Sequence, residues 1–215
     1  MHVLVTGFGG FMDVPSNPSQ RLVQALNPVI AGFPIRKVIL PVDAIAIRDV
    51  LAPLWAEGPV AALHLGVALR RRQVSLETRA HNWLEFEVPD NAGHVVSGRP
   101  IMDEGPALVG TRLPVDVIQH RLEQKGVPSN LSRSAGRFIC NQVMYESLIH
   151  LPKSVPVGFV HVPPDELLSE ATGRHTFVPF SLQLKAITSA VETTIQLMDA
   201  FTKGSEESGL ATPGL

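Results

Sequence analysis

The chain has 215 residues, 45% of them hydrophobic, and a formal net charge of −2. This length suits one domain with a sizeable core. The nearly balanced charge gives no electrostatic basis for binding nucleic acid or an anionic membrane surface. No uncharged stretch is long enough to span a bilayer, and the N-terminal segment lacks the features of a signal peptide. With one cysteine no intramolecular disulfide can form, so we expect a cytoplasmic protein.

The predicted elements alternate between apolar strands and amphipathic helices. In chain order we expect a strand at 2–6, a helix at 17–26, a strand at 35–42, a helix at 44–57, a strand at 60–65 and an extended segment at 73–82. Residues 83–111 are rich in Gly, Pro, Asp and Asn, which predicts long loops with short strands. A helix at 113–122, a helix at 139–149, a strand at 156–162 and a last helix from 181 to about 202 complete the set.

This alternation predicts an α/β fold: a single domain with a twisted, largely parallel sheet and helices on both faces. We assign residues 1–203 to this domain. Residues 204–215 are small and polar, and we expect a disordered C-terminal tail there.

A glycine-rich turn follows the first strand, at Gly7, Gly9 and Gly10. Two phenylalanines interrupt the run, and no G-x-G-x-x-G can be read from it, which argues against a dinucleotide site. The same turn suits an aromatic-walled pocket at the carboxyl end of a strand, where open α/β sheets place their ligands.

Cys140, the only cysteine, stands at the start of the predicted helix 139–149. A thiol in the first turn of a helix meets unpaired backbone N–H groups and the positive end of the helix dipole, and both favour the thiolate. The helix has an amphipathic pattern, with one apolar face available to a core. The alternative is that Cys140 is a small buried hydrophobic residue, as many free cysteines are.

Two further residues carry possible chemistry. His161 ends an apolar strand, and Glu77 lies in an apolar extended segment, where a carboxylate is costly to bury unpaired. Either could be structural: His161 as a hydrogen-bonded core histidine, and Glu77 as a partner for Arg71 or Arg79. Together with Cys140 they supply a nucleophile, a base and an orienting carboxylate. The other histidines show no metal-site spacing, so we expect neither a metal nor a cofactor.

A series of short segments from Val3 to about Pro163 forms a specific ordered set. It includes Thr6-Gly7-Phe8, Asn17-Pro18-Ser19, Pro89-Asp90-Asn91-Ala92-Gly93, Ser134-Ala135-Gly136, Phe138-Ile139-Cys140-Asn141 and Gly158-Phe159-Val160-His161-Val162-Pro163. With this set the sequence resembles the pyroglutamyl peptidase family, the type I pyrrolidone-carboxylate peptidases. These are cysteine peptidases that remove an N-terminal pyroglutamyl residue.

The resemblance implies a function and a site. The chain would hydrolyse small peptides that begin with pyroglutamate, through an acyl-thioester on the cysteine, and would form a homodimer or homotetramer. The implied residues are the catalytic Glu77, Cys140 and His161 and the substrate-binding Phe8, Phe11, Asn17 and Phe138. The aromatic residues would wall a pocket for the lactam ring, and Asn17 would hold the loop around it.

The sequence also departs from the family pattern. The family usually has Gly-Gln-Ala-Gly-Gly-Arg where this chain has Gly66-Val-Ala-Leu-Arg-Arg71, so that Val67, Leu69 and Arg70 replace a glutamine and two glycines. Glu87 replaces a frequent arginine, and one residue is inserted at Asp103-Glu-Gly-Pro106. These departures leave two alternatives open: a related cysteine amidase with another small cyclic or acyl-amino substrate, and a non-catalytic member that binds a peptide.

Overall fold

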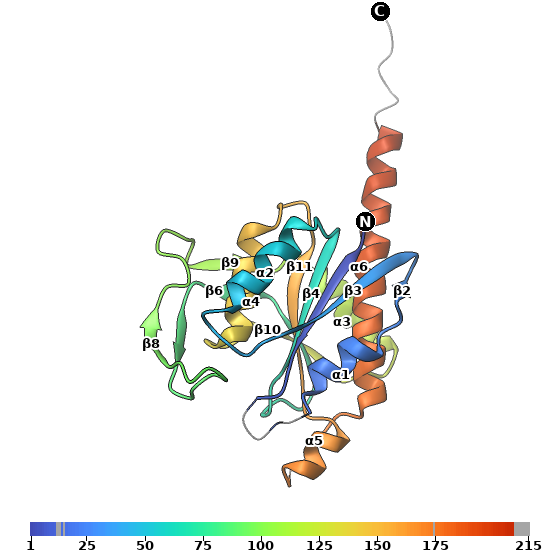
Figure 1. The fold of residues 1–215 in the computed structure, drawn as a ribbon. Helices are drawn as coiled ribbons and strands as arrows, with labels where there is room; N and C mark the ends of the chain where they lie inside the picture. Colours follow the sequence, from blue (N-terminus) through green and yellow to red (C-terminus); the bar gives the residue numbers. More distant parts are fainter. Residues whose placement is uncertain (12–13, 15, 174, 209–215) are drawn as a thin grey trace, which may run out of the picture.

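The computed structural model describes residues 1–11, 14, 16–173 and 175–208, and for residues 201–208 it describes the backbone alone (Figure 1). The strands are β1 (Val3–Phe8), β2 (Val29–Ile30), β3 (Phe33–Leu40), β4 (Ala61–Val67), β5 (Val74–Glu77), β6 (Arg79–His81), β7 (Leu84–Phe86), β8 (Val96–Arg99), β9 (Leu108–Gly110), β10 (Ser129–Ser132) and β11 (Val157–Val162). The helices are α1 (Pro18–Ala25), α2 (Ile47–Ala56), α3 (Val115–Gln124), α4 (Ile139–His150), α5 (Glu166–Ala171) and α6 (Phe180–Ser208).

Seven strands form one sheet in the order β10-β5-β11-β4-β1-β3-β2. The pairs β10–β5, β11–β4, β4–β1 and β1–β3 are parallel, whereas β5–β11 and β3–β2 are antiparallel. The predicted α/β fold with a largely parallel sheet is therefore confirmed. Two short antiparallel pairs, β6–β9 and β7–β8, lie outside this sheet.

Helices cover both faces of the sheet, as predicted. Residues of α1, α3 and α6 pack on one face, and those of α2 and α4 on the other (Figure 1). In β1, Val3 and Val5 join the first layer and Leu4 joins the second, because successive side chains of a strand point to opposite faces. Both faces being covered, β1 is apolar at nearly every position and fully buried.

Helix α4 is buried on all sides, so the prediction that only one side faces the core was wrong. Its residues 141–148 are all buried. Chain from the 79–110 region packs over the side that would otherwise face water. Asn141 illustrates the consequence: its side chain accepts from the backbone N–H of His81 and donates to the carbonyls of His81 and Trp83. A polar side chain buried in this way needs such partners.

Three helices differ from the predicted bounds by two residues or more. Helix α3 spans Val115–Gln124 rather than 113–122. Helix α2 begins at Ile47 rather than near residue 44, because Asp43 Oδ1 accepts from the backbone N–H groups of Ile45 and Ala46 and leaves Ile45 exposed. Helix α6 continues to Ser208, beyond the predicted end near residue 202. Of the tail predicted for 204–215, residues 204–208 belong to this helix, and residues 209–215 lie outside the described residues. None of the described helices is long and apolar enough to cross a membrane.

Three elements were not predicted: β2, β10 and α5. The first has two residues, and the second, Ser129–Ser132, is polar and pairs only with β5 at the edge of the sheet. Neither has the alternation of apolar residues that marks a half-buried strand. Helix α5 is one short helix after the Pro163–Pro164 pair, capped by Asp165, whose carboxylate accepts from the backbone N–H of Leu168.

One connection matters for the site. Strand β11 lies between β4 and β5, parallel to β4 and antiparallel to β5. The carboxyl ends of β4 and β11 and the amino end of β5 therefore meet at one edge. The loop of residues 68–73, which joins β4 to β5, crosses the end of β11, and the backbone N–H of Ala68 donates to the carbonyl of Val162. Open α/β sheets bind ligands at this edge.

Candidate active site

Strand pairing brings Glu77 and His161 together. His161 on β11 lies opposite Ser75 on β5, and Glu77 lies two residues farther along β5 on the same face of the sheet. Diagonal neighbours of this kind are within reach of long side chains. His161 Nδ1 is 2.8 Å from Glu77 Oε1, and both side chains are buried. The structure thus joins two residues that are 84 positions apart in the sequence.

The same carboxylate also binds Arg71. Arg71 Nη2 donates to Glu77 Oε1 at 2.8 Å and to the carbonyl of Ser134 at 3.1 Å. The structural alternative for Glu77, a partner for Arg71, therefore holds alongside its contact with the histidine. The second oxygen, Oε2, is buried and has no hydrogen-bond partner among the described residues.

Cys140 approaches the same face of the sheet from helix α4, which covers that face. It is the second residue of α4, and its Sγ lies over Gly66 of β4, the residue that pairs with His161. A Cβ atom at position 66 would be 3.0 Å from Sγ and 2.9 Å from Cζ of Phe159, so only glycine fits without a shift. Within the described residues Cys140 and His161 form no hydrogen bond. Such contacts are often long until a substrate is bound.

The start of α4 offers backbone donors. The carbonyl of Phe138 accepts from the backbone N–H groups of Asn141 and Gln142. The backbone N–H groups of Ile139 and Cys140 belong to the first turn of α4, where no carbonyl of the helix itself lies in position to accept from them. N–H groups of a first helical turn are suited to an anionic oxygen.

The surroundings of Cys140 do not favour the thiolate form of its side chain. Burial, the largest cause, and the nearby Glu77 carboxylate together raise its pKa to about 12, against the opposing effect of the backbone N–H of Cys140. The expectation that the helix start alone would stabilise a thiolate was therefore wrong. Desolvation of the charged form outweighs the helix terminus here. The side chain is nevertheless only half-buried, so a reagent can reach it.

An apolar pocket of about 140 Å³ opens beside the thiol. It is lined by Phe8, Phe11, Val14, Asn17, Val42, Val67, Leu69, Phe138, Ile139 and Cys140. The four substrate-binding residues predicted from sequence are all in this lining. The volume is below the roughly 300–1,000 Å³ of pockets for drug-sized ligands and suits a single small ring.

The aromatic residues of the pocket differ in exposure. The ring centroids of Phe11 and Phe138 are 5.3 Å apart, and both side chains are partly exposed. Phe8 is 4% exposed and packs against Phe159, with ring centroids 6.5 Å apart. Asn17 caps α1 and also donates to the carbonyl of Gly9 at 3.0 Å, which ties down the loop that carries Phe11.

Comparison with known proteins fits this geometry. A profile of the family described as pyroglutamyl peptidase matches residues 1–198. The chain belongs to the pyroglutamyl peptidase family. The pyrrolidone-carboxylate peptidase of Pyrococcus furiosus is 33% identical over 206 residues, which cover 91% of this chain and 99% of the relative. That of Deinococcus radiodurans is 35% identical over 176 residues, with 79% and 81% covered.

Solved structures agree on the fold. The crystal structure of pyrrolidone carboxyl peptidase from Thermus thermophilus is 44% identical, with a TM-score of 0.87, and covers 89% of this chain and 99% of that one. The enzyme from Pyrococcus furiosus has a TM-score of 0.87 at 32% identity, with 92% of this chain and 100% of that one covered.

Departures from the pyroglutamyl peptidase pattern fall both inside and outside the pocket. Val67 and Leu69 line it directly, which sequence reasoning flagged only as altered positions. Val14, Val42 and Ile139 were not predicted at all, because isolated apolar residues carry no local signal of a pocket wall. Glu87 is exposed and absent from the pocket lining.

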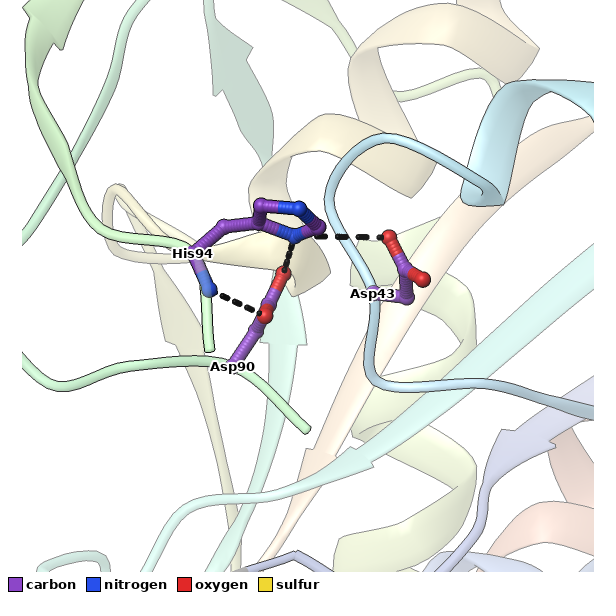
Figure 2. A group of neighbouring side chains, drawn as sticks. All are labelled: Asp43, Asp90 and His94. Carbon is purple, nitrogen blue, oxygen red and sulfur yellow. Dashed lines mark hydrogen bonds and ion pairs between the residues drawn. The ribbon is translucent and has the colours of Figure 1, made fainter. Parts of the chain in front are cut away.

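A cluster of Asp43, Asp90 and His94 lies in loops (Figure 2). Asp43 directly follows Val42, which lines the pocket. Asp90 accepts from the backbone N–H groups of Ala44, Ala92 and His94, and its Oδ2 is 3.2 Å from His94 Nδ1. Burial opposes ionisation of Asp90, but these hydrogen bonds outweigh it and hold its pKa below the usual value.

The potential ligand atoms of this cluster lie within 4.8 Å of one another, but they are already used within the protein. The neighbouring Asn91 donates to the carbonyl of Gly10 at 2.8 Å, and its backbone N–H donates to the carbonyl of Val42. The cluster therefore orders the loop that braces the rim of the pocket.

Proposed function

We propose that this protein is a cysteine omega-peptidase that removes N-terminal pyroglutamate from small peptides. Cys140 is the nucleophile, His161 the base and Glu77 the residue that orients the histidine. Family membership supports the reaction class, and the 2.8 Å contact between His161 Nδ1 and Glu77 Oε1 is the observation that supports these roles best. That contact makes Nδ1 the protonated nitrogen and leaves Nε2 free to act as the base.

The reaction proceeds in two steps. His161 Nε2 takes the proton of Cys140 as Sγ attacks the carbonyl carbon that joins pyroglutamate to the next residue. The tetrahedral intermediate collapses, the C–N bond breaks, and the departing amine receives the proton from His161. Water then attacks the thioester, with His161 again accepting a proton. The thiol is restored, and free pyroglutamate is released.

Each contact in the site has a part in this scheme. The backbone N–H groups of Ile139 and Cys140 hold the oxyanion. Phe8, Phe11 and Phe138 wall the lactam ring, and Asn17 fixes the loop that closes over it. Because the thiol has a pKa of about 12, we place proton transfer together with attack rather than before it.

Two further statements belong to this proposal. We assign the protein to the cytoplasm, where reducing conditions keep the single thiol free. We also propose a homodimer or homotetramer, on the basis of family resemblance alone. Light scattering coupled to gel filtration measures the mass directly, and a mass of 23.3 kDa, that of one chain, would contradict it.

A second candidate is a related cysteine amidase for a different small acyl group. Val67 and Leu69 favour it, because both line the pocket where the family pattern has glutamine and glycine. One assay separates the two: hydrolysis of a fluorogenic pyroglutamyl amide compared with the matching prolyl and glutamyl amides, with Cys140→Ser as the control. We expect selective pyroglutamyl hydrolysis. Preference for another acyl group would favour the amidase, and tight binding without turnover would indicate a non-catalytic member.

A further inference from the structure

The loop of residues 68–73 carries three consecutive arginines over the end of β11. Arg71 turns inward and binds Glu77 and the carbonyl of Ser134. Arg70 and Arg72 are exposed, and neither has an ion-pair or hydrogen-bond partner among the described residues. Their guanidinium groups are therefore available to an external anion, unlike that of Arg71.

These two cations flank surface hollows, and the described residues that line them include no carboxylate. One, of about 320 Å³, is lined by Leu69, Arg70, Arg71, Arg72, Gly173, His175 and Thr176. A second, of about 370 Å³, is lined by Arg71, Arg72, Gln73, Ser75 and Asn130. A hollow with several positive groups and no negative one attracts carboxylates.

The first of these hollows, which Leu69 lines, adjoins the catalytic pocket. Leu69 lines both, so the pocket for the ring and the basic hollow share one wall. His161, which protonates the departing amine in the proposed mechanism, lies on β11, and the arginine loop crosses the end of that strand. In the proposed mechanism the departing amine lies beside His161, so the rest of the peptide extends from the pocket toward this histidine and the loop.

We infer that Arg70 and Arg72 bind a carboxylate of the departing peptide and so give the enzyme a preference for pyroglutamyl peptides with an acidic group close behind the scissile bond. This inference rests on the proposed function. The carboxylate has two sources, an Asp or Glu side chain or the C-terminus of a pyroglutamyl dipeptide. Arginine suits either, because its planar guanidinium pairs with a carboxylate in a bidentate way.

The test uses pairs of substrates that differ by one charge. Pyroglutamyl-Glu-Ala-amide and pyroglutamyl-Gln-Ala-amide isolate the side chain, and pyroglutamyl-Ala and its amide isolate the C-terminus. A neutral pyroglutamyl arylamide reports the chemical step. We expect kcat/KM to be about 3–10-fold higher for the acidic member of at least one pair at low ionic strength, and the gain to shrink in 0.5 M salt because exposed charges are screened.

The variant Arg70→Gln/Arg72→Gln is expected to bring this ratio to about 1, with less than a twofold change on the arylamide. Arg36→Gln is the matched control, since Arg36 lies opposite Leu4 near the amino end of β1, away from the site. Its ratio should equal that of the wild type. The pair that responds identifies the source of the carboxylate.

An acidic preference that is absent in the wild type, or that survives in the double variant, would overturn the inference. A wild type that fails to cleave the arylamide would instead contradict the proposed function. Binding of the uncleaved peptides to Cys140→Ser, measured by calorimetry with and without the two arginine substitutions, tests the docking site independently of turnover.

Discussion

Glu77 Oε1 lies 2.8 Å from His161 Nδ1 and accepts a second hydrogen bond, also of 2.8 Å, from Arg71. A single oxygen thus links His161 to the loop that precedes β5. The carboxylate is buried and held from two directions, which fixes both its position and that of the imidazole. Any change to this oxygen is expected to affect the orientation of the His161 imidazole before it affects the binding of a substrate.

Glu77→Gln keeps the shape of the side chain but removes its charge. The amide can also present its N–H₂ group to Nδ1 and so favour the wrong tautomer of His161. We expect kcat/KM to fall by about 10²-fold or more, by analogy with triad carboxylates that contribute up to ~10⁴-fold. Kinetics on protein shown to be folded by circular dichroism measure this. Unchanged kcat/KM would reduce Glu77 to a structural partner of Arg71.

The reactivity of Cys140 should depend on His161. In the wild type we expect iodoacetamide to label this only thiol at neutral pH and to abolish activity together with the labelling. In His161→Ala the thiol has no base, and with a pKa of about 12 its labelling rate should rise about tenfold per pH unit up to at least pH 10. Equal rates for both proteins at pH 7, measured by mass spectrometry, would contradict the assigned base.

Gly66 is expected to be intolerant of any side chain. A methyl group there would meet Cys140 Sγ at 3.0 Å and Phe159 at 2.9 Å, so Gly66→Ala must displace the sulfur that we propose as the nucleophile. Displacement of a reacting atom can cost about 10²-fold, which is the fall in kcat/KM that we expect. Gly110→Ala is the control, because a Cβ atom at Gly110 meets nothing within 4 Å. Similar activity of the two variants would rule out the close approach.

Phe11 and Phe8 should separate binding from stability. Phe11 is partly exposed, so Phe11→Ala should weaken transition-state stabilisation, measured as the fall in kcat/KM, by about 1–3 kcal/mol. The loss should be similar for peptide and arylamide leaving groups, and Tm should change little. Phe8 is buried in the core, so Phe8→Ala should cost roughly 3–5 kcal/mol of stability. Thermal melts beside kinetics check both. A large fall in Tm for Phe11→Ala with unaltered catalysis would make Phe11 a core residue.

His64 should make the fold sensitive to acid. It is fully buried, its Nδ1 is 2.8 Å from Thr6 Oγ1, and burial lowers its pKa from 6.5 to about 3. As the pH falls below 6.5, the unfolded chain binds a proton that the folded chain does not. Stability is therefore lost from pH 6.5 downward, by up to ~1.4 kcal/mol per pH unit until about pH 3.

Urea unfolding at a series of pH values measures this slope. The variant His64→Gln has no such proton to bind, and its stability should fall less steeply over the same range. Parallel slopes for the two proteins would show that other groups govern the acid response.

The sequence predicts those residues of this site that stand in a recognisable local pattern. Cys140 begins a helix, His161 ends an apolar strand, and Glu77 is a charge within an apolar segment. Each pattern is visible in a few residues. That the three residues lie close together in space cannot be seen in the sequence, since it depends on β11 pairing with β4 on one side and β5 on the other. The resemblance to a family supplied that step.

Other features depend on packing alone and could not be predicted. Val14, Val42 and Ile139 line the pocket only because distant segments meet there. The high pKa of Cys140 follows from desolvation by the assembled core, which the position of a residue in a helix does not reveal. In the same way α4 has a helical apolar pattern, but what covers its outer side is determined by chain more than 30 residues away.

The burial of α4 on every side bears on how the enzyme would lose activity on heating. The helix that carries Cys140 in its first turn has residues 141–148 inside the protein and cannot fray from the surface. Its amide protons should exchange with solvent only through opening of the whole domain. Catalytic activity and global structure are therefore expected to disappear in one transition, with no folded but inactive form preceding it.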